Sequence, residues 1–62
     1  MTVAQFANHY LPSNAKIKVV KRFNTIFEGN LDELYYAEKD VLKSVVAMIG
    51  AENGTVCLSC RN

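Results

Sequence analysis

The most reactive side chains of the chain belong to two cysteines near its C-terminal end. Cys57 and Cys60 have the spacing C-x-x-C, which can supply half of a zinc site or form a thiol redox pair. Redox pairs lie at the start of a helix, where the dipole lowers the thiol pKa, but these cysteines lie in the strand-like segment "TVCLSC". On an extended strand their Cα atoms are about 10 Å apart and their side chains point to opposite faces. A disulfide requires about 4.4–6.8 Å, so we expect two free thiols, with Cys60 in the core.

The other polar residues do not complete a metal or catalytic site in the sequence. Zinc would need two more ligands, and His9 is the only histidine. The pattern places His9 at the polar margin of a helix, away from any serine, cysteine or carboxylate that could act with it. The carboxylates of residues 32–40 have no defined paired geometry. The sequence therefore predicts a protein that is not an enzyme and has no cofactor, metal or small-molecule substrate.

A basic segment suggests an alternative function. Phe23 and Phe27 lie among its charges, and aromatic side chains between cations are typical of platforms that bind single-stranded nucleic acid. Lysines also protect edge strands against unwanted pairing, and the net charge of +1 gives no overall attraction to nucleic acid. A weak nucleic-acid-binding module therefore ranks below a protein-binding one. Its candidate residues are Lys16, Lys18, Lys21 and Arg22.

Length and composition indicate a single small domain, residues 1–62. A hydrophobic content of 50% and a charged content of 21% are typical of a folded globular chain. No run approaches about 18 apolar residues and no signal-peptide pattern is present, so we expect a cytoplasmic protein with no membrane partner. At this length apolar burial barely offsets the entropy lost on folding, which favours pairing with a second copy.

The first predicted element is a helix between Thr2 and Pro12. Thr2 and Gln5 have the spacing of a capping box, and proline ends the helix. Apolar residues recur along this segment with the period of a helix, so one face must pack on a sheet. These residues are Val3, Phe6, Ala7, Tyr10 and Leu11.

Alternating β-branched residues predict a first hairpin from residues 16–21 and 25–29. A three-residue connection, residues 22–24, would place Asn24 in the left-handed conformation that such loops require. This register sets Lys18 opposite Glu28 and Val19 opposite Phe27.

A short helix should follow the first hairpin. Asn30 and Glu33 form a second capping box, and we expect the helix to continue to about residue 37 or 38. Leu31, Leu34 and Tyr35 share its inner face, and the polar "EKD" follows as a connection.

The dipeptide Asn53-Gly54 between apolar alternating runs predicts a second hairpin. A two-residue turn there places Gly50 opposite Cys57 and Ala47 opposite Cys60. Cys57 then lies on the outer face of the hairpin. The other face, which we expect to join the core, carries Ala47, Ile49, Ala51, Val56, Leu58 and Cys60.

Together these elements predict an α+β fold. An N-terminal helix precedes two antiparallel β-hairpins joined by a short helix, and the hairpins form a four-stranded antiparallel sheet. We expect this sheet to be curved or barrel-like, because curvature limits its exposed edges.

Apolar residues outside the predicted core indicate a surface for a protein partner or a homodimer. Tyr35 and Tyr36 are adjacent on the short helix, so one of them must be partly exposed, and tyrosine is a common interface anchor. We predict a non-catalytic protein-interaction or accessory domain that self-associates. Its candidate partner-binding residues are Tyr36, Val46, Met48 and Cys57.

The layout "IKVV…TIFEGNLDEL…SVVAMIGAENGTVCLSC", after a capped helix ending in Leu-Pro, resembles small uncharacterised accessory proteins encoded by prophages and mobile elements of Gram-positive bacteria. The similarity extends from the first helix to the last strand and rests on the "FEG" turn and the "AENG" hairpin. It implies a bacterial accessory protein with a binding role, and it identifies no catalytic or ligand residue.

Overall fold

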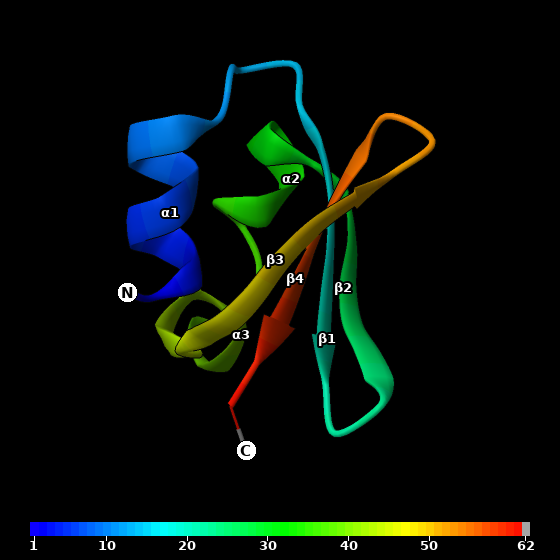
Figure 1. The fold of residues 1–62 in the computed structure, drawn as a ribbon. Helices are drawn as coiled ribbons and strands as arrows, with labels where there is room; N and C mark the ends of the chain where they lie inside the picture. Colours follow the sequence, from blue (N-terminus) through cyan, green and yellow to red (C-terminus); the bar gives the residue numbers. More distant parts are fainter. Residues whose placement is uncertain (62) are drawn as a thin grey trace.

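The computed structural model describes residues 1–61 and consists of a sheet with helices on one of its faces (Figure 1). We call this the helix-covered face and the opposite one the open face. The elements in chain order are α1 (Val3–Tyr10), β1 (Lys16–Lys21), β2 (Asn24–Asn30), α2 (Leu31–Leu34), α3 (Lys39–Lys43), β3 (Val46–Glu52) and β4 (Thr55–Cys60).

The sheet has four strands in the order β2-β1-β4-β3, and it is mixed. Each hairpin forms an antiparallel pair, as predicted, but β1 and β4 pair in parallel at the centre. The prediction of an entirely antiparallel, barrel-like sheet was therefore wrong in part. The chain crosses the helix-covered face through α2 and α3, which brings the second hairpin beside β1 with its last strand running in the same direction as β1 (Figure 1). The sheet stays open, so β2 and β3 are its two edges.

The core lies between the central strands and the helices. Ile17 and Val19 on β1 and Leu58 on β4 are fully buried, and Cys60 on β4 is also buried. These side chains define the helix-covered face, so their neighbours in sequence along each strand point to the open face. From the helices, the buried apolar residues are Val3, Phe6, Ala7, Leu31, Leu34 and Val41.

The predicted capping box of α1 is confirmed. The Gln5 N–H donates to Thr2 Oγ1 at 3.2 Å, and the Thr2 N–H donates to Gln5 Oε1 at 2.9 Å. The helix ends before Pro12, and its apolar face packs on the core as expected, except at Tyr10. Tyr10 is mostly exposed, and its ring lies 5.3 Å from that of Phe6.

The first hairpin has the predicted register but a different turn. Lys18 pairs with Glu28 and Val19 with Phe27. The turn has two residues, because Arg22 (φ 54°) and Phe23 (φ 65°) are both left-handed while Asn24 already pairs with Lys21. A β-bulge between the Val19 and Val20 pairs absorbs the extra residue, Ile26. Left-handed backbone at both turn positions matches the twist of a hairpin, which a loop with only Asn24 left-handed would match less closely.

The connection between the hairpins contains two short helices instead of one. α2 ends at Leu34, earlier than predicted, and α3 forms from Lys39 to Lys43 where a polar connection was expected. The Asn30 N–H donates to Glu33 Oε1 at 3.3 Å, as the predicted capping box requires. Tyr35, predicted on the inner face, is half exposed, and its hydroxyl donates to Asn8 Oδ1 at 2.7 Å.

The second hairpin has the predicted register over most of its length. Gly50 pairs with Cys57 and Ile49 with Leu58, but a bulge makes Cys60 pair with Val46 instead of Ala47. The predicted core face of β3 is also wrong, because Ala47, Ile49 and Ala51 are exposed. The buried helix residues pack on the central strands, so β3 extends beyond the covered part of the sheet.

Candidate interaction surface on the third strand

β3 has a backbone edge that is covered only at its beginning. The Val46 N–H donates to the Met1 carbonyl at 2.8 Å, and Thr2 forms an antiparallel bridge with Val45. Beyond Val46, no backbone group within residues 1–61 bonds to the outer edge of β3. The stretch from Met48 to Glu52 is therefore open for pairing.

The turn determines which backbone groups of β3 point outward. Asn53 (φ 51°) and Gly54 (φ 79°) form a type I′ turn, which makes Glu52 and Thr55 a hydrogen-bonded pair. Alternation along the ladder then directs the N–H and C=O groups of Glu52, Gly50 and Met48 toward β4. The corresponding groups of Ile49 and Ala51 point to the open edge.

The side chains of β3 are exposed and apolar on both faces of the sheet. Met48, on the open face, is 71% exposed, and Ile49, on the helix-covered face, is 58% exposed. Val45, just before the strand, is also exposed, and Glu52 is the only charged residue of β3. Natural edge strands are normally protected by charged side chains, especially lysine, or by proline, and the open part of β3 has only Glu52, at its end.

A hollow of about 280 Å³ on the open face connects β3 to the turn of the first hairpin. Met48 lies at one end of it and the fully exposed Phe23 at the other. The hollow is mainly apolar, so it extends the exposed surface of β3 across the sheet. The residues that line it are Val20, Arg22, Phe23, Met48, Ser59 and Cys60.

The residues predicted to bind a partner do not form one surface. Met48 and Cys57 share the open face, where Met48 pairs with Ser59 and Cys57 with Gly50. Val46 was expected beside them, but the bulge turns it inward, where it packs against the core. Tyr36 is strongly exposed, but it follows α2 on the helix-covered side.

Two residues of this surface were missed by the sequence reasoning. Ile49 was assigned to the core because it alternates in phase with Leu58, and Phe23 was read as part of a longer loop. The exposure of Ile49 depends on how far the helices extend over the sheet, which the residues around Ile49 do not indicate.

The four predicted nucleic-acid residues are also separated. Lys16 and Lys18 lie on the open face, while Lys21 pairs with Cys60 and belongs to the helix-covered face. Arg22 lies in the turn. Lys18 stands opposite Glu28, and a hollow of about 200 Å³ brings both beside Glu52 and Cys57, so the charge there is mixed.

The two thiols lie on opposite faces of β4, as predicted. Both are free; Cys60 is buried, and Cys57 is partly exposed with its thiol directed at the Thr55 carbonyl, 3.9 Å away. Burial raises the pKa of the Cys60 thiol above its ordinary value of 9.0, and nearby Lys21 partly opposes this rise. No group of three or more histidine, cysteine or acidic side chains converges within residues 1–61.

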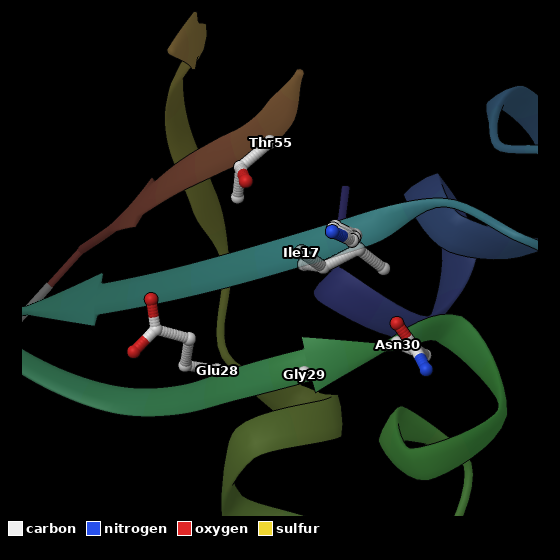
Figure 2. Close-up of a pocket in the computed structure, with 6 residues that line it drawn as sticks. Ile17, Glu28, Gly29, Asn30 and Thr55 are labelled. Carbon is white, nitrogen blue, oxygen red and sulfur yellow. The ribbon is translucent and has the colours of Figure 1, made fainter. Parts of the chain in front are cut away.

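A third hollow, of about 240 Å³, contains no reactive pair (Figure 2). Glu28 is its single carboxylate, and it is exposed. Figure 2 shows Glu28 and Asn30 on β2, with Ile17 on β1 and Thr55 on β4 across the hollow. Lys16 and Gly29 complete the lining.

Comparison with known proteins gives no family for this chain. No protein-family model, no curated protein and no solved structure matches it. Within residues 1–61, none of the helices has the length and apolar composition needed to cross a membrane.

Proposed function

We propose that this chain is a non-catalytic protein-interaction domain whose contact surface is the open part of β3 and the adjoining hollow. One observation carries the proposal: Met48 and Ile49 are adjacent, strongly exposed and directed to opposite faces of a strand with an unpaired backbone edge. An exposed apolar edge of this kind is a template for pairing with another chain. The same surface supports self-association.

A charge placed in the middle of the surface tests this function. We expect Met48→Glu to weaken self-association by about tenfold or more, because the contact would desolvate the new carboxylate. Sedimentation at micromolar to millimolar concentration measures the effect. Thr25→Glu is the matched control, since Thr25 is exposed on the opposite edge strand. A chain that stays monomeric, and whose binding to any protein partner ignores Met48→Glu, would contradict the proposal.

The second candidate function is weak nucleic-acid binding by the first hairpin. The observation in its favour is that Arg22 and the fully exposed Phe23 lie together at the turn, which suits stacking of an unpaired base. Binding to a single-stranded oligonucleotide at about 50 mM salt should then weaken steeply as salt is added. It should also weaken with Phe23→Ala. No binding at low salt would rule this function out.

An accessory role in a mobile element stays a prediction. It rests on the resemblance of the sequence layout alone. The genes that neighbour the coding sequence would test it, because a phage or transposon context would place the protein in such an element.

A further inference from the structure

We propose that the occupant of the β3 edge is a second copy of this chain, paired antiparallel through residues 48–52 about a two-fold axis at Gly50. The pairing would join the two sheets into one continuous eight-stranded sheet. The inference rests on the proposed interaction function, which it makes specific.

The first argument is the stretch of edge that is free. Met1 already bonds the Val46 N–H at 2.8 Å, so a second strand can pair only beyond that point. The strand ends at Glu52, where the Asn53-Gly54 turn leads the chain back to β4. The outward-pointing backbone groups within this stretch belong to Ile49 and Ala51.

The second argument is the register. In an antiparallel pair, the backbone N–H and C=O groups of two facing residues both point toward the other strand or both point away from it. A two-fold axis between two residues would place an inward residue opposite an outward one. The axis must therefore pass through a residue. An axis at Ile49 would make Glu52 of the second copy pair with Val46, whose N–H is already bonded to Met1. An axis at Gly50 ends the pairing at Met48 and sets Ile49 opposite Ala51 of the second copy. Every outward N–H and C=O of Ile49 and Ala51 then has a partner.

The third argument is the fit of the side chains. On the helix-covered face, the large Ile49 lies beside the small Ala51 of the second copy, twice by symmetry. On the open face, Met48 lies diagonally across from Gly50 of the second copy, where a Cβ atom added to the glycine would meet nothing within 4 Å. The flexible thioether of methionine fills such irregular space well.

The fourth argument is charge. Glu52 is the only charged residue of β3, and in this register it faces Met48 of the second copy. The two Glu52 side chains are offset by four residues, which is about 13 Å along the strands. That separation exceeds the Debye length of about 8 Å at physiological ionic strength, so their repulsion is largely screened.

The size of the edge indicates how tight the dimer should be. A standard interface removes about 800 Å² from each partner. The whole chain exposes 4392 Å², and five residues of one edge make up a smaller part of that surface than a standard interface needs. We therefore expect a dissociation constant in the micromolar range or weaker, with a population of dimer that depends on concentration.

Cysteine cross-linking tests the register. At a two-fold axis a residue meets its own copy, and the non-hydrogen-bonded Gly50 pair would have Cα atoms about 4.5 Å apart, within the disulfide range of about 4.4–6.8 Å. We expect Gly50→Cys, in a Cys57→Ser background, to form a covalent dimer under mild oxidation. The Cys57→Ser parent should not, since its remaining Cys60 is buried. Glu52→Cys should cross-link with Met48→Cys in a mixture but not with itself.

A charge on the edge tests the pairing without cross-linking. Ile49→Lys should weaken the dimer by about tenfold or more, because the two added lysines would occupy diagonal positions about 7–8 Å apart across the paired strands, where like charges repel. Thr25→Lys on β2 is the matched control and should sediment like the unmodified chain. Ile49 is 58% exposed, so the substitution leaves the core of the monomer intact.

The outcomes separate this inference from the proposed function. If Ile49→Lys does not change the affinity of the dimer and Gly50→Cys does not cross-link, edge pairing is overturned. The proposal of a self-associating interaction domain would still stand. Self-cross-linking of Ile49→Cys in place of Gly50→Cys would overturn the register. A chain that is monomeric at millimolar concentration and does not cross-link would overturn the second copy as occupant. The proposed function would then depend on whether Met48→Glu weakens binding to another protein.

Discussion

The two edge strands of the sheet, β2 and β3, are each the outer strand of a hairpin, but their surfaces differ. β2 is largely polar, with Asn24, Thr25 and Glu28 exposed and Phe27 packed toward the core. A bulge in its middle interrupts the regular edge. β3 carries apolar side chains on both faces, and its bulge lies at the covered end.

The difference shows how one small sheet can protect one edge and leave the other free to pair. A bulge and a charge in mid-strand disturb the regular row of donors and acceptors that a second strand would need. β3 lacks both between Met48 and Ala51. The position of the helices adds to this difference, because they pack on the strands that precede β3 in the sheet order and leave β3 without a buried residue.

The largest expected effect compares the edge strand with the central strand beside it. Leu58 and Ile49 are paired in register on the same face, but Leu58 is fully buried and Ile49 is mostly exposed. Leu58→Ala should lower the free energy of unfolding by about 2–5 kcal/mol, because it removes buried methyl groups and leaves a cavity. Ile49→Ala should lower it by less than about 1 kcal/mol at concentrations where the chain is monomeric. Urea unfolding followed by circular dichroism measures both.

Comparable losses from the two variants would contradict the assignment of β3 as an uncovered edge. The comparison is fair because both changes shorten a branched aliphatic side chain to alanine. If Ile49→Ala lowered the free energy of unfolding only at high protein concentration, this would show that Ile49 becomes buried in a dimer.

The next effect compares the turns of the two hairpins. Arg22 and Phe23 hold left-handed backbone that side chains disfavour, whereas Asn53 and Gly54 hold it with residues suited to it. Replacing the first pair by the second, as Arg22→Asn with Phe23→Gly, should raise the free energy of unfolding by about 1–2 kcal/mol. In the second hairpin, Gly54→Ala should lower the free energy of unfolding by about 1 kcal/mol or more, because Gly54 has φ 79°.

A double variant that is no more stable than the parent would mean that Phe23 makes a compensating contact. If the same variant also lost binding to a partner or a nucleic acid, the strained turn would be part of a binding site.

The sequence was a good guide to features that depend on neighbouring residues. The capping box of Thr2 and Gln5 and the register from Asn53-Gly54 follow from local hydrogen bonding, which tertiary packing did not override. The opposite directions of Cys57 and Cys60 follow from the two-residue period of a strand.

The features that were wrong depend on contacts between distant segments or leave no periodic pattern in the sequence. The parallel pairing of β1 with β4 requires a crossover that no local pattern encodes. The bulge at Ala47 shifts Val46 inward, and a single unpaired residue leaves no periodic signal. α3 spans Lys39–Lys43, which is too short for a helical period to be recognised. The exposure of Ile49 depends on how far the helices extend over the sheet, so the candidate surface was only partly predictable.

A smaller effect compares the covered and open ends of β3. Thr2 caps α1 and also holds the segment that bonds Val46. Thr2→Ala should cost about 1 kcal/mol in the free energy of unfolding, the usual value for a lost helix cap. It should also speed hydrogen exchange of the Val46 amide, which otherwise donates to Met1. An unchanged exchange rate of the Val46 amide would show that its hydrogen bond to Met1 does not depend on the Thr2 cap.

The smallest effect compares the two faces of β4 through its thiols. Burial raises the pKa of Cys60 above its value in the unfolded chain, so the folded state favours the neutral thiol. Below pH 9 both states are protonated and this thiol adds no pH dependence. As the pH rises further, the unfolded thiol ionises first, so stability falls by up to about 1.4 kcal/mol per pH unit until the folded pKa is reached. Cys60→Ala should remove that part of the slope, whereas Cys57→Ala on the open face should leave it. If the free energy of unfolding of the two variants had the same slope against pH, the two faces of β4 would not differ in the way their burial indicates. The helix-covered face would then be as open to water as the open face.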